Sequence, residues 1–271
     1  RLGYEPEDLQ RLLAAIRAPH GLVLVTGPTG SGKTQSLYAC LNLLNTPEVN
    51  IATVEDPCEI QLAGINQVNV QDKPGLSFAV ALRAFLRQDP DILMVGEVRD
   101  LETANIAIQA AQTGHLVLST LHTNDAPATL VRLRNMGTAP YNIAASVSLI
   151  TAQRLVRCLC PHCKRSITIP AATLLKAGLP EGLCAAERVT AFEPVGCTLC
   201  HKGFSGRTGI FQVMPMSAEM QALVLQEAGI QKIERQARRE GVSSLRIAGL
   251  RKVLQGVTSL DEVLVATRED T

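Results

Sequence analysis

Short apolar runs alternate with stretches of helical spacing over the first half of the chain. Leu22–Val25 is an unbroken aliphatic run of the kind that forms a buried strand. Further strands are predicted at Asn50–Glu55, Asp91–Val95 and Leu116–Leu121, and helices at Lys33–Leu44, Ser77–Arg87 and Glu102–Ala111, the second with Ser77 as its N-cap. Strands that alternate with helices are typical of a parallel sheet covered by helices, so the pattern predicts an α/β fold.

The rest of the chain departs from this alternation. Polar and apolar residues alternate over Ala63–Val70, which predicts a small hairpin inserted into the larger sheet. Residues 158–209 are rich in Cys, Pro and Gly and poor in periodicity, so we expect a small module held by metal rather than by a core. Helical spacing returns from Ser217 onward and predicts a helical tail.

These patterns divide the chain into four expected segments. Residues 1–20 should contain a leading helix and the end of a linker from a missing N-terminal domain, because the chain opens without an initiator Met. Residues 21–157 should form the α/β core, residues 158–212 the cysteine module, and residues 213–271 a C-terminal helical subdomain. We therefore expect this sequence to be a fragment of a longer protein.

Composition narrows the range of functions. The 26 Lys and Arg residues nearly balance the 25 Asp and Glu residues, for a net charge of +1, and aromatic residues make up 3% of a chain without Trp. Binding of nucleic acid through charge or base stacking is therefore disfavoured. Thr103–Asn124 and Asn135–Gln153 carry no charge, but both contain polar groups that hydrocarbon could not satisfy, so we expect buried elements rather than membrane spans.

A glycine-rich motif follows the first predicted strand. Residues 27–34 read GPTGSGKT, which matches G-x-x-x-x-G-K-[ST] between a strand and a helix. The predicted phosphate loop consists of Gly27, Pro28, Thr29, Gly30, Ser31, Gly32, Lys33 and Thr34. Its backbone N–H groups would face the phosphates, Lys33 would reach the β- and γ-phosphates, and Thr34 would place its hydroxyl on Mg²⁺.

Carboxylates end two other predicted strands. Glu97 follows the apolar run Asp91–Val95, where phosphate-loop NTPases place the residue that holds Mg²⁺ or its water. The segment EDPCE, residues 55–59, ends the preceding strand and adds Glu55, Asp56 and Glu59 at the same sheet edge. Such a group of like charges needs Mg²⁺, arginine or water nearby.

Two histidines flank the strand Leu116–Leu121. His122 would emerge at the edge where open α/β folds bind ligands, and we expect it to sense the γ-phosphate. For His115, packing and function are equally good interpretations.

The cysteines predict a metal site in a reducing compartment. Two C-x-x-C pairs have the form of a structural zinc ribbon, with Cys160, Cys163, Cys197 and Cys200 as the expected ligands. Four thiolates complete a tetrahedral site and leave no open position for catalysis, so the Zn²⁺ would be structural. Alternative ligands are His162, His201 and Cys158, and the remaining scattered thiols are Cys40, Cys58 and Cys184.

The motifs together resemble a known family. In order and spacing, GPTGSGKT, TVEDPCE, LRQDPDILMVGEVRD and TGHLVLSTLHTNDA resemble the Walker A, aspartate box, Walker B and histidine box of the traffic ATPases of bacterial type II secretion and type IV pilus assembly. The resemblance covers nearly the whole chain. It implies a RecA-like P-loop NTPase domain with a zinc-binding cysteine module and a C-terminal helical subdomain.

The same resemblance implies roles for individual residues. Glu59 would be the general base that orients the attacking water and Glu97 would act on the Mg²⁺ side, although the reverse assignment stays open. Arg99 would neutralise the transferred phosphoryl group, while Arg83 and Arg87 would either share that role or form structural ion pairs. Further arginines come from a preceding domain in the family, so we expect the isolated chain to bind nucleotide and hydrolyse it slowly.

The favoured hypothesis is a cytoplasmic, homohexameric, Mg²⁺-dependent ATPase at the inner-membrane face. By resemblance it would power pilus assembly or type II secretion through an inner-membrane platform protein and a cytoplasmic recruitment protein, with no stable nucleic acid and membrane association only through partners. The cysteine module is similar to assembly and secretion members, whereas pilus retraction members generally lack it. Two alternatives remain, namely a DNA-translocating or conjugative P-loop motor and a non-hydrolysing nucleotide-dependent scaffold.

Overall fold

The chain forms two compact units, each built from separate stretches of sequence. The computed structural model describes residues 2–71, 75–183 and 186–268. The α/β unit comprises Glu5–Ala152 and Val213–Val242, and the cysteine unit comprises Arg1–Tyr4, Gln153–Gln212 and Ser243–Thr271. These limits cut across the segments expected from composition, because the helices after residue 213 are divided between the two units.

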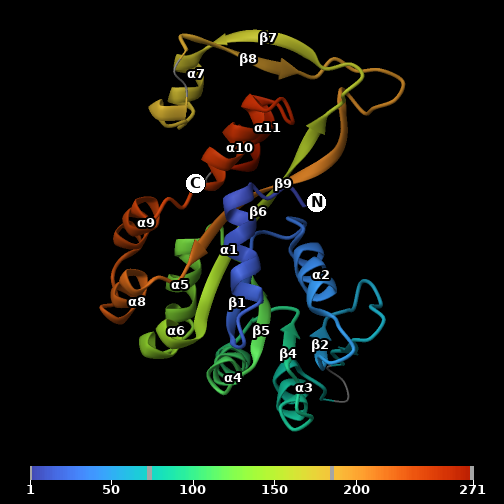
Figure 1. The fold of residues 1–271 in the computed structure, drawn as a ribbon, viewed down its shortest axis with the longest axis vertical. Helices are drawn as coiled ribbons and strands as arrows, with labels where there is room; N and C mark the ends of the chain where they lie inside the picture. Colours follow the sequence, from blue (N-terminus) through green and yellow to red (C-terminus); the bar gives the residue numbers. More distant parts are fainter. Residues whose placement is uncertain (1, 72–74, 184–185, 269–271) are drawn as a thin grey trace. The chain divides into compact units, whose positions relative to one another are not determined.

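A seven-stranded sheet has the strand order β3-β2-β4-β5-β1-β6-β9, and the limit between the two units falls within β6 and within β9. Its strands are β1 (Gly21–Thr26), β2 (Ile51–Glu55), β3 (Asn66–Asn69), β4 (Ile92–Val95), β5 (Leu116–Leu121), β6 (Val147–Leu159) and β9 (Phe204–Pro215). Strands β1, β2, β4 and β5 lie side by side in Figure 1 and pair in parallel along β2-β4-β5-β1. This arrangement confirms the predicted α/β fold and all four strands expected in its core.

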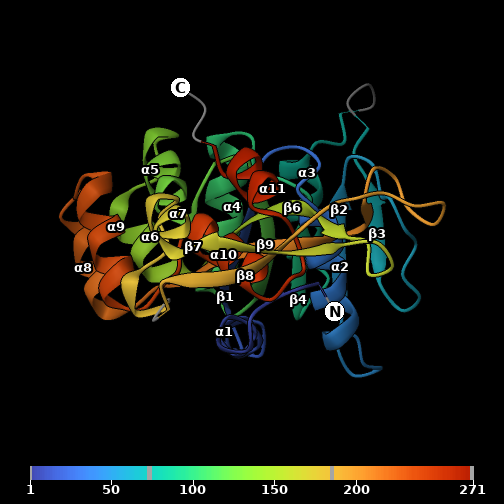
Figure 2. The same cartoon turned by 90° about the horizontal axis from the view of Figure 1, so that it is seen from above.

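Helices cover both faces of this sheet. In Figure 2, α1 (Pro6–Ile16) and α2 (Lys33–Leu44) lie on one face, and α3 (Phe78–Phe85) and α4 (Leu101–Gln112) lie on the other. The central strands are therefore apolar on both sides, and every residue of β1 and β5 is buried. Helix α3 begins as predicted, because the Ser77 side chain accepts a hydrogen bond from the backbone N–H of Val80.

Four further helices belong to the same unit. They are α5 (Ala126–Asn135), α6 (Pro140–Ser146), α8 (Ala218–Leu225) and α9 (Ile230–Arg239). Helix α6 packs against α8 and α5 packs against α9, so the last part of this unit's sequence lies beside helices from much earlier in the chain.

The prediction of a hairpin at residues 63–70 was wrong. The segment contributes one edge strand, β3, which pairs in parallel with β2 through Ala52–Asn66 and Val54–Val68. Alternation of polar and apolar residues shows that a strand has one exposed face, but it does not specify the direction of the partner strand. The polar residues Gln67 and Asn69 instead serve a neighbouring loop, as described below.

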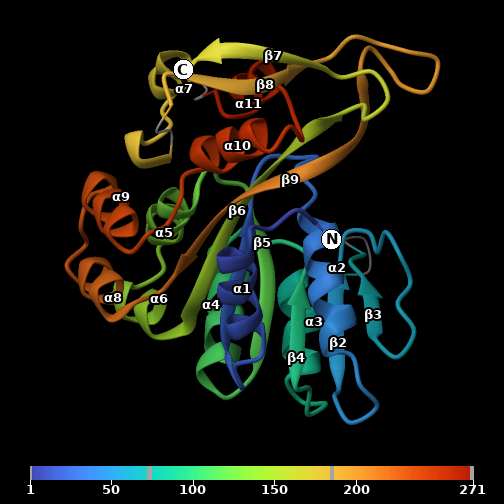
Figure 3. The ribbon, with the colours of Figure 1, turned by 45° about the horizontal axis from the view of Figure 1, so that its top comes forward.

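The cysteine unit has a core of its own. A two-stranded antiparallel sheet pairs β7 (Arg165–Pro170) with β8 (Arg188–Glu193). The unit also contains α7 (Ala171–Lys176), a 3₁₀ turn (Glu181–Leu183), α10 (Leu245–Leu254) and α11 (Leu260–Ala266), seen together with the two strands in Figure 3. Its buried cluster consists of Leu174, Leu179, Ala191, Leu250, Val253 and Val263.

This core corrects the expectation that metal alone orders residues 158–209. Three of the buried residues come from α10 and α11, at the far end of the sequence, so composition within the cysteine-rich stretch understated the apolar surface available to it. Cys184 lies outside the described residues.

No helix among the described residues is long and apolar enough to cross a bilayer. Thr103–Asn124 instead contributes α4 and β5, and Asn135–Gln153 contributes α6 and the start of β6.

Gly249 of α10 packs closely against Val263 of α11, so a larger residue at position 249 should disturb this contact. A Cβ built on Gly249 would lie 2.5 Å from Cγ1, 3.1 Å from Cγ2 and 3.3 Å from Cβ of the buried Val263. Because Val is stiff at χ1 and all three atoms are close, rotation of its side chain offers little relief. We expect Gly249→Ala to destabilise the cysteine unit by about 1–3 kcal/mol, measured by urea unfolding followed by circular dichroism.

Gly182→Ala is the matched control, because a Cβ there meets nothing within 4 Å. Equal stability of Gly249→Ala and the wild type would contradict the packing argument, whereas recovery in Gly249→Ala/Val263→Ala would support it.

Candidate functional site

Parallel pairing places the predicted motifs at one edge of the sheet. The phosphate loop follows β1, His122 follows β5, Glu97 follows β4 and the segment 55–59 ends β2. These strands are neighbours in the order β2-β4-β5-β1 and run in the same direction. Their carboxyl ends therefore meet at a single edge, which is where open α/β sheets bind ligands.

The phosphate loop has the backbone geometry that its glycines allow. Gly30 and Gly32 have φ values of 77° and 87°, in the left-handed region that side chains rarely adopt, and a Cβ on Gly30 would meet nothing within 4 Å. Helix α2 begins at Lys33, so its first N–H groups point into the loop. The Lys33 ammonium donates to the carbonyl oxygens of Gly27 and Pro28 at 2.9 and 3.1 Å. The loop thus offers backbone donors and one cation to an anionic ligand.

Glu59 is joined to the first turn of α2. Its carboxylate Oε1 accepts a hydrogen bond from the Thr34 hydroxyl at 3.4 Å, and its own backbone N–H donates to the Tyr38 hydroxyl at 3.1 Å. The side chain of Glu59 is exposed, whereas Tyr38 is only 2% exposed. The structure therefore brings a solvent-accessible carboxylate next to the residue that ends the phosphate motif.

Glu55, by contrast, is a buried carboxylate that takes no part in the exposed cluster. It is 3% exposed, and its oxygens accept hydrogen bonds from the hydroxyls of Tyr38 and Thr53 at 2.5 and 2.6 Å and from the amide of Gln67 at 3.1 Å. Neutral donors satisfy this group, as a buried carboxylate requires. Of the three acids in the segment 55–59, Glu55 is structural.

Glu97 lies between two cationic or potentially cationic side chains. Its Oε1 accepts from Arg99 at 2.5 Å, its Oε2 lies 3.2 Å from Nε2 of His122, and Arg99 also reaches Asp56 at 3.3 Å. Burial acts to raise the pKa of Glu97, but the hydrogen bonds and charges of Arg99 and His122 outweigh it and hold that pKa below its usual value. Glu97 is therefore ionised at neutral pH.

Three predicted candidates lie apart from this cluster. Arg83 forms an ion pair with Glu102 at 2.6 Å between α3 and α4, which favours the structural interpretation left open for it. Arg87 is exposed just beyond the end of α3. His115 precedes β5, so it lies at the opposite edge of the sheet from His122, and its Nδ1 is 3.0 Å from the carbonyl oxygen of Ala110.

Sequence reasoning missed the residues that hold Glu59 in place. Tyr38 lies one helical turn after Thr34 on α2, and Gln67 lies on β3 beside Glu55. The usable signal was spacing, because Tyr38 at i+4 from Thr34 must share a helix face with it.

The four expected metal ligands converge in the cysteine unit. The Sγ atoms of Cys160, Cys163, Cys197 and Cys200 all lie within 4.8 Å of one another. Three of the sulfur–sulfur distances are 3.9, 3.7 and 3.6 Å. These agree with the separation of about 3.8 Å that tetrahedral Zn–S bonds of about 2.3 Å require. Backbone N–H groups of Gly196 and Cys197 also donate to the sulfurs of Cys163 and Cys200, each at 3.3 Å. The residues present fit a tetrahedral thiolate site.

The alternative ligands do not join this group. Within the part of the chain that the structure describes, the cluster contains four thiols and neither His162, His201 nor Cys158.

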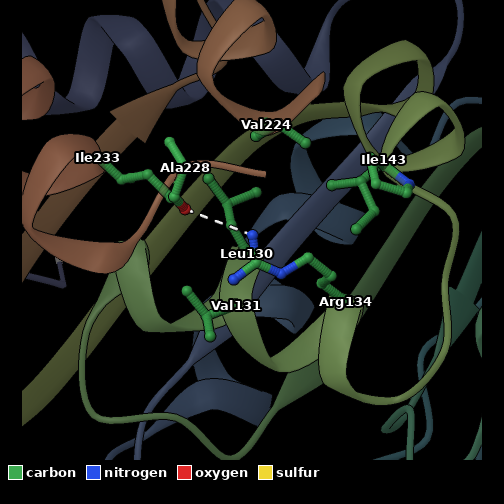
Figure 4. Close-up of a pocket in the computed structure, with 8 residues that line it drawn as sticks. Leu130, Val131, Arg134, Ile143, Val224, Ala228 and Ile233 are labelled. Atoms are coloured by element: carbon green, nitrogen blue, oxygen red, sulfur yellow. Dashed lines mark hydrogen bonds between the residues drawn. The ribbon is translucent and has the colours of Figure 1, made fainter. Parts of the chain in front are cut away.

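An apolar groove elsewhere in the α/β unit is a weaker candidate (Figure 4). It is lined by Leu130, Val131, Arg134, Pro140, Ile143, Val224, Ala228 and Ile233. Its one cationic group, the Arg134 guanidinium, donates to the carbonyl oxygen of Ala228 at 3.4 Å. The lining has no convergent polar groups that would orient a substrate, so the sheet edge is the better site.

Comparison with known proteins gives a consistent family. Residues 1–265 match the family model described as Type II/IV secretion system protein. The chain is 57% identical to the type IV pilus assembly ATPase PilB of Acinetobacter baylyi, over 99% of this chain and 46% of that protein. It is 48% identical to the type II secretion system protein E of Pseudomonas aeruginosa, over 99% of this chain and 53% of that protein. The chain thus spans about half the length of these relatives.

Solved structures show the same architecture. The pilus retraction motor PilT with bound ADP superimposes with a TM-score of 0.70 at 27% identity, over 99% of this chain and 66% of that one. The Legionella pneumophila ATPase DotB shares the fold, with a TM-score of 0.67 at 23% identity over 97% of this chain and 63% of that one. From its four ordered motifs, its sheet topology and these similarities, the chain belongs to the Type II/IV secretion system protein family.

Proposed function

We propose that this chain is the ATP-hydrolysing domain of a motor that powers type IV pilus assembly or type II protein secretion. The observation that carries the proposal is the convergence of the phosphate loop, Glu59 and Glu97 at one sheet edge. The names of the relatives, which include ATPases of pilus assembly, agree with this chemistry.

Each residue at the edge has a role suited to its position. The N–H groups at the start of α2 and the Lys33 ammonium would bind the β- and γ-phosphates of ATP. Thr34 and Glu97 would hold Mg²⁺, and the bound ion would neutralise charge on the phosphate oxygens. Glu59 would orient the attacking water and accept its proton, and the opposite split of roles between Glu59 and Glu97 is the alternative that experiment must separate. Arg99 and His122 would hold Glu97 in place and respond to the γ-phosphate.

The finer features of the proposed motor rest on the family. We propose a homohexamer at the cytoplasmic face of the inner membrane, working through a platform protein and a recruitment protein. Two observations favour assembly or secretion over retraction. The chain is 57% and 54% identical to two pilus assembly ATPases, and it has the four-cysteine cluster.

The cysteine cluster is proposed to hold a structural Zn²⁺ ion. All four positions of a tetrahedral site would be thiolates, so the ion would stabilise the unit without an open position for substrate.

Amide substitutions separate the roles of the two carboxylates. Glu59→Gln should lower the ATP turnover rate by about 100-fold or more while ATP binding persists, because an amide cannot accept the proton of the attacking water. Glu97→Gln should weaken the Mg²⁺ dependence of binding as well as turnover. Both are measured by phosphate release and calorimetric ATP binding in the full-length protein, with the exposed Glu48→Gln as control.

Undiminished turnover in Glu59→Gln with loss in Glu97→Gln would reverse the assignment. Undiminished turnover in both variants would remove the proposed catalytic site.

Metal content tests the proposed zinc site. Freshly purified protein should contain about one equivalent of zinc, and Cys197→Ser should lose it and increase hydrogen exchange in β7 and β8, because the thiolate site no longer closes. Cys158→Ser is the matched control and should retain the metal, since Cys158 lies outside the cluster. Less than half an equivalent in the wild type would count against the site.

Cys58 lies next to Glu59 in the loop that follows β2. Its thiol contacts Glu55 Oε1 at 3.5 Å, and burial, reinforced by the charge and hydrogen bond of Glu55, raises its pKa to about 11. The thiolate is the reactive form, so roughly one thiol in a thousand would be reactive at pH 8. Alkylation at Cys58 should be slow at pH 8 and accelerate about tenfold per pH unit up to its pKa.

Mass spectrometry of the Cys58 peptide against time and pH measures this rate. Rapid labelling at pH 7 that does not change with pH would show that the thiol is not held by Glu55.

A further inference from the structure

The loop that connects β2 to β3 carries Glu59. Side chains, rather than a neighbouring strand, form hydrogen bonds with backbone groups of this loop. Asn69 Oδ1 accepts from the N–H of Cys58 at 2.7 Å. Gln67 holds the loop twice, donating to the carbonyl oxygen of Ile60 at 3.0 Å and accepting from the N–H of Leu62 at 2.6 Å. Because Gln67 and Asn69 are two residues apart on β3, both lie on one face of that strand. The edge strand therefore anchors the loop on both sides of Glu59.

Helix α2 holds Glu59 itself at two points. The Tyr38 hydroxyl accepts from the Glu59 N–H at 3.1 Å, and the Thr34 hydroxyl contacts the Glu59 carboxylate at 3.4 Å. Tyr38 and Thr34 are four residues apart and so occupy the same face of the helix that begins at the phosphate loop. The backbone N–H and the carboxylate of Glu59 thus both contact α2, the helix whose N-terminus would bind the phosphates.

The direction of these hydrogen bonds is set by Glu55. A carboxylate can only accept, so the Tyr38 hydroxyl donates to Glu55 Oε2, at 2.5 Å, and keeps its lone pairs for the Glu59 N–H. Burial raises the pKa of Tyr38 to about 12, and the hydrogen bond and charge of Glu55 act in the same direction. The phenol consequently stays protonated throughout the physiological pH range. Its hydroxyl donates to Glu55 and accepts from the Glu59 N–H.

We propose that Tyr38 is a positioning residue for Glu59, fixing the distance between this carboxylate and the phosphate loop through its hydroxyl. The inference rests on the proposed role of Glu59 in ATP hydrolysis. Gln67 supports the same geometry, because it bonds both Glu55 and the backbone next to Glu59. Misplacement of a catalytic group by about 1 Å can lower a rate by about 100-fold without changing substrate affinity.

The test removes the Tyr38 hydroxyl and retains the ring. In the full-length protein, Tyr38→Phe should lower kcat by about 10- to 100-fold and leave the calorimetric Kd for ATP within about twofold of the wild type, because the phosphate loop is intact. Tyr38→Phe/Glu59→Gln should be no slower than Glu59→Gln alone, since one residue acts through the other. Tyr141→Phe is the control, because Tyr141 is 66% exposed and should behave as wild type.

Gln67→Met, which keeps the side-chain length and loses its hydrogen bonds, provides a second variant with the same expected split between kcat and Kd. Wild-type kcat in Tyr38→Phe, with Glu59→Gln inactive, would overturn the positioning role and leave the proposed function standing. Parallel losses of kcat and ATP affinity, or failure of both variants to fold by circular dichroism, would assign the network to stability alone and overturn the inference. Full turnover in Glu59→Gln would overturn the role of Glu59 and this inference with it.

Discussion

The parallel pairing of β2, β4, β5 and β1 is the constraint on which the site depends. Each of these strands ends in a short loop with polar residues, and none of those loops is close to another in sequence. Hydrogen bonding in register, with Val25 beside Thr120 and Val95 beside Ser119, aligns the four ends to within a residue or two. Every residue of β1 and β5 is buried, so a shift in register would place side chains of a different size at packed positions on both faces of the sheet.

Several carboxylates collect at this edge, and the structure accommodates them in different ways. Glu55 is buried and receives hydroxyl and amide donors, so its charge is spread over neutral dipoles. Glu97 is paired with Arg99 and lies beside His122, so its charge is offset by side chains that are about half exposed. Glu59 is exposed and has the weakest contact, a hydroxyl at 3.4 Å. The Glu59 side chain is thus open to solvent, while its backbone N–H is held by Tyr38.

The features that could be predicted from sequence are those with a local physical cause. The phosphate loop needs glycines at particular positions, and strands such as β1 need continuous apolar residues, so both are visible without a partner. The pairing of Arg83 with Glu102 was not predictable, because it depends on how α3 packs against α4. The spacing of Tyr38 from Thr34 shows only that the two share a helix face, because the carboxylate and the loop that Tyr38 contacts are brought to it by tertiary structure. The hairpin error at β3 has the same origin, because strand direction is decided by the partner.

The division of the sequence between the two units has a consequence for biosynthesis. The core of the cysteine unit joins Leu174 and Leu179 to Leu250, Val253 and Val263, and α8 and α9 of the α/β unit lie between these segments in the sequence. During synthesis from the N-terminus, the early apolar residues emerge well before the helices that will cover them. A ribosome-bound chain must therefore keep that surface from associating with other chains until α11 is complete, and a premature stop within the last two helices would leave the apolar surface uncovered.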